Sequence, residues 1–144
     1  MHVTIGPLRW RDAFAIARWH YPGPYAIYDI QATALLGMRI YHHALDEQDQ
    51  LIGFYSFIHR DDEVEVGLAL RPDLTGQGLG CAFLQAGLEY AKDLFHPLRF
   101  RLDVATFNQR AMRVYERAHF RPVRTFTRQI GREFVECLEM ARDA

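Results

Sequence analysis

Three glycines alternate in the stretch LRPDLTGQGLGCAFL, from Leu70 to Leu84, just before a run of residues with helical spacing. A backbone without Cβ atoms can turn its N–H groups toward an anion, and the positive end of the following helix adds to the attraction. A dinucleotide fingerprint is an alternative, but it needs Gly or Ala at position 81, where this chain has Cys. A tight turn alone needs only one glycine. We therefore expect residues 76–80 to cradle a phosphate.

The residues around this loop fall into short elements that would position it. Alternating apolar and polar residues predict strands over residues 2–5, 38–45, 51–59, 63–71 and 99–105, with a closing hairpin over 121–141. Apolar residues at helical spacing predict helices over residues 10–19, 28–37, 79–94 and 108–118. This order of elements predicts an α/β fold in which helices pack against a mixed sheet.

Composition and charge narrow the class of protein. With 144 residues, of which 49% are hydrophobic, the chain has the size of one globular domain, which we place at residues 1–144. A net charge of −1 without runs of like charge argues against nucleic-acid and membrane partners. Cys81 and Cys137 have no metal-ligand spacing and the start lacks a signal peptide, so we expect a cytoplasmic protein. We expect no metal site, because His42 and His43 point to opposite faces of a strand.

Two stretches of the sequence resemble the signatures of one known family. LALRPDLTGQGLGCAFL resembles the acetyl-CoA signature of the GCN5-related N-acetyltransferases (GNAT), and NQRAMRVYERAHFRPV resembles their second signature. Two departures are present: Thr75 occupies the usual Arg or Gln position, and AHF replaces the common xGF. The resemblance implies a mostly antiparallel, twisted sheet of about seven strands with about four helices, splayed between its central parallel strands.

The resemblance also implies where acetyl-CoA binds as a co-substrate. Leu68 and Leu70 correspond to the strand whose backbone pairs with the pantetheine arm, and residues 75–80 correspond to the pyrophosphate loop. Thr75 still offers a backbone N–H and a hydroxyl, and Asn108 corresponds to a residue beside the splay. The expected cofactor-binding residues are therefore Leu68, Leu70, Thr75, Gly76, Gln77, Gly78, Leu79, Gly80 and Asn108.

Three residues are candidates for acid and base catalysis. By the resemblance, Tyr115 corresponds to the tyrosine that protonates the leaving thiolate, and a positioned phenol can act as such an acid. Its place on the apolar stripe of Ala111 also fits simple packing. An ammonium acceptor needs a base, for which Asp103 and Glu65 are the candidates. Alternatively, Asp103 pairs with Arg101, and Glu65 is a solvated edge residue.

The acceptor side is expected to be aromatic. RWHYPGPYAIYD gathers aromatic residues between the first two helices, and Tyr21, Tyr25 and Gly67 are the expected acceptor-binding residues. The expected reaction transfers an acetyl group from acetyl-CoA directly to a primary amine, either a small molecule or a peptide N-terminus, in a monomer or a homodimer. A non-catalytic acyl-CoA-binding sensor or interaction module of the same fold is the alternative.

Overall fold

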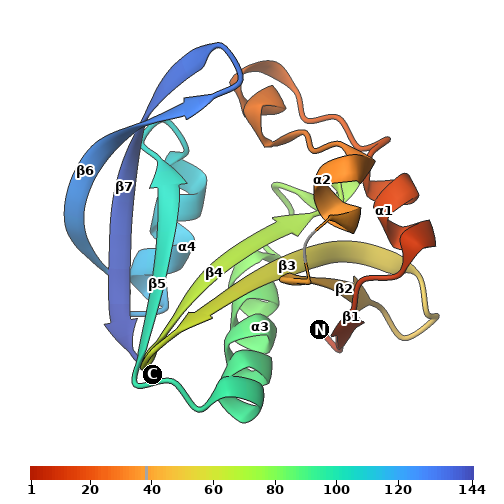
Figure 1. Ribbon diagram of the computed structural model, residues 1–144, viewed down its shortest axis with the longest axis horizontal. Helices are drawn as coiled ribbons and strands as arrows, with labels where there is room; N and C mark the ends of the chain where they lie inside the picture. The colour runs from red at the N-terminus through yellow and green to blue at the C-terminus, as the bar shows by residue number, and fades with distance from the viewer. Residues whose placement is uncertain (38) are drawn as a thin grey trace.

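A seven-stranded sheet with helices on both faces makes up the computed structural model, which describes residues 1–37 and 39–144 (Figure 1). The strands are β1 (Thr4–Pro7), β2 (Tyr41–Leu45), β3 (Leu51–Arg60), β4 (Glu63–Leu70), β5 (Arg99–Ala105), β6 (Arg121–Ile130) and β7 (Glu133–Asp143). The α-helices are α1 (Trp10–Ile16), α2 (Ala32–Leu36), α3 (Gly80–Phe95) and α4 (Gln109–Arg117). Two 3₁₀ helices, η1 (Gly23–Tyr28) and η2 (Pro72–Leu74), lie in the connections.

The sheet is antiparallel except at its centre. Its strand order is β1-β2-β3-β4-β5-β7-β6, and within the part of the chain that the structure describes only β4 and β5 run parallel to each other. These two strands pair at three positions, from Glu63 with Arg99 to Glu65 with Arg101, and then diverge. The predicted α/β class and the predicted splay between the central parallel strands are confirmed.

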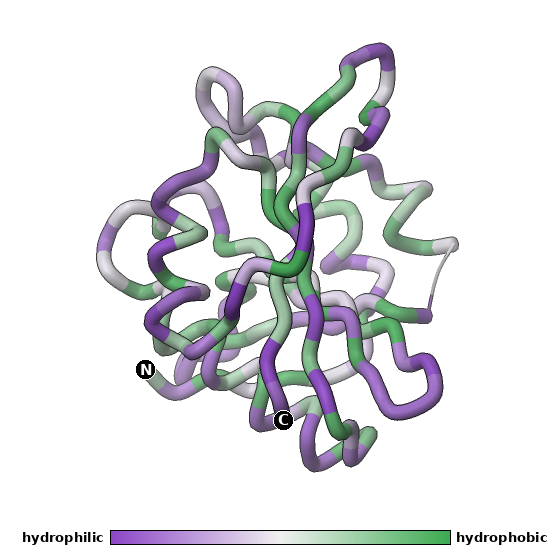
Figure 2. The backbone as a smooth tube through the Cα atoms, turned by 90° about the vertical axis from the view of Figure 1, so that its left-hand side faces the viewer, coloured by the Kyte–Doolittle hydropathy of each residue, from purple (hydrophilic) through white to green (hydrophobic). Residues whose placement is uncertain are grey.

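Each face of the sheet has its own hydrophobic core. On one face, α3 and α4 pack against Val64, Phe100 and Leu102, which are all buried. On the other face, α1 and α2 cover Phe54, partly through the buried Leu35. Figure 2 shows hydrophobic and hydrophilic residues interspersed along the backbone. Among the helices of the described residues, none is both long and apolar enough to cross a membrane.

The N-terminal part departs from the sequence prediction. α1 ends three residues before the end of its predicted range, and the helix predicted over 28–37 shrinks to α2. Between them the chain forms η1, because Pro22 and Pro24 fix φ at values that suit the start of a tight helical turn. The strand predicted from residue 38 begins at Tyr41, and Met38 itself lies outside the described residues.

A buried carboxylate connects α1 to β2. Asp12 accepts hydrogen bonds from the backbone N–H and the guanidinium of Arg9 and from Nδ1 of His43, at 2.8 to 2.9 Å. Burial on its own would raise the pKa of Asp12, but the hydrogen bonds from Arg9 and His43 outweigh it and lower the pKa to about 2. Because α1 leads directly into the segment that contains η1, this network helps to hold that segment over the sheet.

Replacing Asp12 with Asn should lower the free energy of unfolding at pH 7 by roughly 1–3 kcal/mol, because the buried acceptor loses its charge while its donors remain. The pKa of Asp12 is about 2 in the folded state and 3.8 in the unfolded state. The stabilisation that the charged carboxylate provides is therefore fully present above the unfolded pKa and is lost as the pH falls through the folded pKa. Urea unfolding at pH 7 and at pH 3 measures both effects. Asp93→Asn, at an exposed position of α3, is the control, and an equal loss in the two variants would contradict the prediction.

Candidate active site

The divergence of β4 and β5 leaves one edge of β4 without a ladder partner. The N–H of Arg71 donates to the carbonyl of Ile52 in β3 at 2.8 Å. Backbone groups alternate along a strand, so those of Leu68 and Leu70 point the other way, into the split. The carbonyl of Leu70 accepts a hydrogen bond there from the hydroxyl of Tyr21 at 2.7 Å. An extended ligand can therefore pair with β4 at Leu68 as a strand would.

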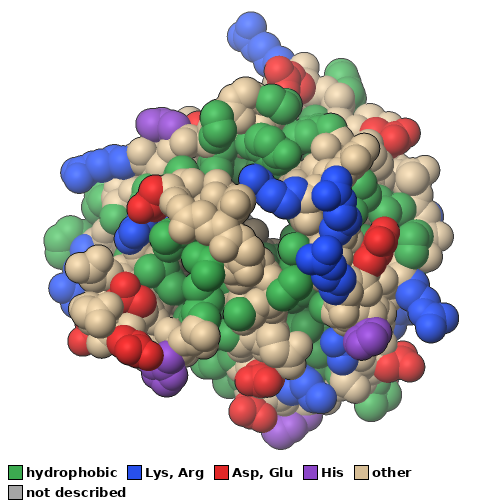
Figure 3. Space-filling view, turned by 180° about the vertical axis from the view of Figure 1, so that it is seen from behind, with side chains coloured by type: hydrophobic (Ala, Val, Ile, Leu, Met, Phe, Trp, Pro, Cys, Tyr) green, Lys and Arg blue, Asp and Glu red, His purple; other side chains and the backbone are tan. Residues whose placement is uncertain are grey.

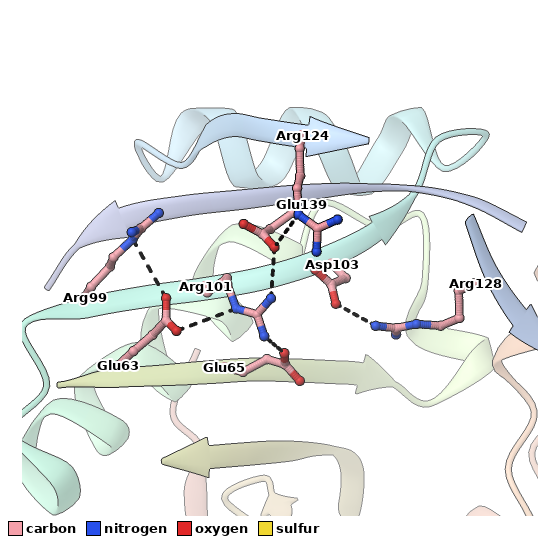
Figure 4. Close-up of polar contacts among 8 residues, drawn as sticks. All are labelled: Glu63, Glu65, Arg99, Arg101, Asp103, Arg124, Arg128 and Glu139. Atoms are coloured by element: carbon pink, nitrogen blue, oxygen red, sulfur yellow. Dashed lines mark hydrogen bonds and ion pairs between the residues drawn. The ribbon is translucent and has the colours of Figure 1, made fainter. Parts of the chain in front are cut away.

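An ion-pair cluster marks the point where the two strands separate (Figure 4). Arg101, at the last β4–β5 pair, donates to Glu65 of β4 and, at 2.9 Å, to Glu139 of β7. Its Nε also lies 3.8 Å from Glu63. The guanidinium thus joins three neighbouring strands immediately before the sheet divides.

A cavity of about 630 Å³ passes through the sheet at this division. On the face of α3 and α4 its lining includes Gly76, Gly78, Gly80, Ala111 and Tyr115. On the opposite face its lining includes Tyr41, Phe54, Asp103 and Arg128. Two molecules can therefore reach the same point of the sheet from opposite faces.

The glycine loop brings bare backbone to this cavity. Gly76 and Gly78 have φ of 72° and 77°, a region that favours glycine, and a Cβ at Gly78 would meet no atom within 4 Å. α3 begins at Gly80, so the N–H groups of its first turn have no carbonyl partner within the helix. The loop thus presents N–H donors and the positive end of a helix to open space, which suits a phosphate.

Two polar side chains of the loop are already bonded within it. The N–H and the hydroxyl of Thr75 both donate to the carbonyl of Pro72, at 3.3 and 2.8 Å. The side-chain amide of Gln77 donates to the carbonyl of Asp73 at 2.6 Å, and Gln77 lies outside the lining of the cavity. Within the loop, the donors still available to a phosphate are therefore backbone N–H groups. The Thr75 hydroxyl, which the sequence suggested as a donor, is already used.

Three arginines of α4 border the loop. Arg110 lines the main cavity, and its Nη1 lies 3.2 Å from where a Cβ of Gly76 would stand. Arg113 and Arg117 line, with Arg110, an adjoining hollow of about 160 Å³ beside Gly78. The ion pairs found among the described residues involve other arginines. Figure 3 shows Lys and Arg side chains gathered along one side of a hollow on this face, which favours an anionic ligand.

Tyr115 and Asn108 lie where α4 borders the cavity. The Tyr115 ring packs edge-on against Phe120, with the ring centroids 6.2 Å apart. Burial raises the pKa of Tyr115, so its hydroxyl keeps its proton throughout the physiological pH range. Asn108 caps α4 by accepting from the N–H of Ala111, and its Nδ2 donates to the hydroxyl of Tyr28, both at 3.2 Å.

The two candidate carboxylates lie in different surroundings. Asp103 lines the cavity, where its Oδ2 accepts from Nη2 of Arg128 at 2.7 Å and its Oδ1 is buried without a hydrogen-bond partner among the described residues. Asp103 therefore pairs with Arg128 of β6 and not with Arg101. Glu65 is bonded to Arg101 and lies outside the lining of the cavity.

The expected acceptor residues Tyr21, Tyr25 and Gly67 all line the cavity. The guanidinium of Arg110 lies over the Tyr25 ring, 5.2 Å from its centroid, and so connects η1 to α4. A Cβ at Gly67 would meet Oγ of Ser56 in its present rotamer. The cavity wall at this point is bare backbone.

Sequence reasoning did not identify the arginines of the site. Arg110, Arg113 and Arg117 follow Asn108 at helical spacing, and that spacing was the signal that could have found them. Arg128 carries no such signal, because its contact with Asp103 depends on the position of β6 beyond β7 in the sheet. Among residues 1–37 and 39–144, no group of three or more His, Cys, Asp or Glu side chains is placed to share a metal ion.

A sheet divided between two parallel strands, with a glycine loop before the next helix, is the arrangement implied by the GNAT resemblance. The family model described as "Acetyltransferase (GNAT) domain" matches residues 5–121, and the chain belongs to this family. Among curated protein sequences, none matches the chain significantly.

Solved structures show the same fold. A GNAT-family acetyltransferase from Bacillus anthracis superposes with a TM-score of 0.81 at 16% identity, covering 99% of this chain and 95% of that one. A spermidine N-acetyltransferase from Vibrio cholerae, solved with CoA and spermine, gives 0.80 at 18% identity, with 98% and 95% covered. A putative phosphinothricin N-acetyltransferase gives 0.79 at 17% identity, with 99% and 98% covered. At these identities the likeness is one of fold.

Proposed function

We propose that this chain is an N-acetyltransferase that transfers the acetyl group of acetyl-CoA directly to a primary amine. The observation that carries the proposal is the cavity through the divided sheet, which joins the glycine loop on one face to a carboxylate on the other. Membership of the GNAT family supports the same class of reaction. A cavity open to two faces suits direct transfer, because donor and acceptor can be held side by side without a covalent enzyme intermediate.

Acetyl-CoA enters from the face of α3 and α4. The backbone N–H groups of the glycine loop bind its pyrophosphate, and the edge of β4 at Leu68 pairs with its pantetheine arm. Arg110, Arg113 and Arg117 add guanidinium donors for its phosphates. These arginines compensate for Thr75, which stands where the family signature has Arg or Gln. The residues present thus fit the co-substrate.

Tyr115 acts as the general acid for the leaving thiolate. Tyr115 lines the cavity, and burial raises its pKa, so the phenol enters the reaction protonated. The proton then passes from Tyr115 Oη to the sulfur, and solvent returns a proton to the phenolate. Asn108 holds the start of α4, which positions the ring.

Asp103 acts as the general base for the acceptor. Its carboxylate lines the cavity and takes a proton from the acceptor ammonium, and the neutral amine attacks the thioester carbon. The C–N bond forms as the C–S bond breaks. The nitrogen loses a second proton to solvent, which balances the proton that solvent returns to Tyr115, and Asp103 releases the first proton to solvent as the net proton of the reaction. Glu65 remains the alternative base, although Arg101 holds it outside the cavity.

The acceptor occupies the face opposite the cofactor loop. Tyr21, Tyr25 and the bare backbone at Gly67 form its walls. Acceptors of suitable size are small-molecule amines and peptide N-termini. Spermine, bound in the structural neighbour from Vibrio cholerae, is one amine to include among the acceptors tested.

Tyr115→Phe tests the proposal against the non-catalytic acyl-CoA-binding alternative. The change removes one hydroxyl and keeps the ring that packs the helix, so the thermal shift caused by acetyl-CoA should persist while turnover falls about a hundredfold to ten-thousandfold. Turnover is followed by thiol release from acetyl-CoA with a panel of primary amines. Parent protein that binds acetyl-CoA but releases no thiol with any amine would favour the binding-module alternative, and unchanged turnover in the variant would remove the acid role.

Asp103→Asn and Glu65→Gln form a matched pair that tests the base. Asp103→Asn should lower turnover about a hundredfold or more at pH 7, with partial recovery at high pH, where more acceptor amine is already neutral. Glu65→Gln should keep most of the activity, because Glu65 does not border the cavity and Arg101 keeps Glu63 and Glu139 as partners. The pH–rate profiles of the two variants decide the assignment. A larger loss in Glu65→Gln would transfer the role to Glu65.

A further inference from the structure

Asp103 carries a buried acceptor atom that the described chain leaves without a donor. Its Oδ2 is held by Arg128, but its Oδ1 has no hydrogen-bond partner, and the side chain is only 8% exposed. A buried carboxylate oxygen without a donor is costly. Because the side chain lines the cavity, a rotation of the carboxylate about χ2 would bring this atom to the ammonium of a ligand, which can supply the missing hydrogen bond.

Arg128 places a cation directly beside this atom. Its guanidinium uses one N–H on Asp103 and lies over the ring of Phe126, 5.4 Å from the centroid. Of the five N–H donors of a guanidinium, most remain available, because the side chain is 47% exposed and lines the cavity. A carboxylate bound to Arg128 would lie next to an ammonium bound to Asp103.

The charges of the cavity oppose a polycationic acceptor. Asp103 is the one carboxylate in the described lining, and Arg128 contributes a guanidinium group directly beside it. The nearby Glu65 and Glu139 are both engaged by Arg101. A polyamine would therefore leave further ammonium groups without acidic partners and close to Arg128. A molecule with one ammonium and one adjacent carboxylate matches both charges.

The rest of the acceptor wall is aromatic. Tyr41 and Phe54 pack edge to face with centroids 6.1 Å apart, and Tyr25 stacks on Tyr28 at 6.4 Å. All four side chains line the cavity, so an apolar or aromatic group on the acceptor can be buried against them.

We propose that the acceptor is an α-amino acid with an apolar or aromatic side chain, whose ammonium binds Asp103 and whose carboxylate binds Arg128. This inference rests on the proposed function and names the substrate class of the same site. The ammonium that gives its proton to Oδ1 becomes the amine that attacks the thioester, and the carboxylate takes no part in bond formation. Arg128 therefore determines specificity, while Asp103 serves both binding and proton transfer.

Matched pairs of amines test the inference in the parent protein. L-phenylalanine and 2-phenylethylamine share a side chain and differ by the carboxylate, as do L-leucine and 3-methylbutylamine. Thiol release should give a kcat/KM at least about tenfold higher for the amino acid of each pair, because of the charge-assisted hydrogen bonds to Arg128. Spermidine and the dipeptide phenylalanylalanine represent the polycation and the peptide N-terminus, and both should react more slowly than L-phenylalanine.

Variants on β6 identify the group responsible. Arg128→Gln should bring the ratio of kcat/KM between the amino acid and its matched amine close to one, mainly by raising KM for the amino acid. Arg128→Lys should restore part of this ratio. Arg124→Gln is the matched control, because Arg124 lies on the same strand as Arg128, pairs with Glu139 of β7 and lies outside the cavity lining; its kcat/KM ratio should equal that of the parent.

The possible results distinguish a failure of the amino-acid inference from a failure of the proposed function. A ratio of one or less in the parent, a preference for spermidine or the dipeptide, or an unchanged ratio in Arg128→Gln overturns the amino-acid inference and leaves the acetyltransferase intact. No thiol release with any amine, from protein that binds acetyl-CoA, overturns both.

Discussion

The guanidinium of Arg101, held between Glu65 of β4 and Glu139 of β7, lies at the point where the sheet divides. Beyond it, β4 stays paired with β3 at five positions (66–70) and β5 stays paired with β7 at four (102–105), so each half of the sheet is hydrogen-bonded without the other. Removing one partner of such a cluster leaves an uncompensated, partly buried charge. The cluster therefore stabilises the central strands at the point where they separate, and so fixes where the opening that holds the site begins.

Division of the sheet also separates the charges that two different molecules require. On the face of α3 and α4, Arg110, Arg113 and Arg117 surround a loop of bare backbone and favour phosphates. On the opposite face, Asp103 and Arg128 offer one charge of each sign among aromatic rings. The acetyl group would be transferred between the two faces, where each molecule needs to reach only part of the way through the sheet.

Much of the fold was predictable because its signals are local. Alternation along residues 63–71 and 99–105 predicted β4 and β5 closely, and the glycines before α3 predicted the loop. The splay itself followed from the family resemblance, since no residue pattern states where two strands part. The 3₁₀ helix at residues 23–28 was not predicted, because the two prolines at its start were interpreted as the end of the preceding helix. The pairing of Asp103 with Arg128 was also missed, because it joins residues from strands that are not neighbours in the sheet.

Hydrogen–deuterium exchange with and without acetyl-CoA tests most directly whether the divided sheet is the cofactor site. The account predicts slower exchange on binding at the amide of Leu68 and across residues 76–82, with β1 and β2 unchanged. A thermal shift recorded on the same samples shows whether acetyl-CoA is bound. Acetyl-CoA that binds without slowing exchange in β4 or in the glycine loop, or that protects a different surface, would contradict the account.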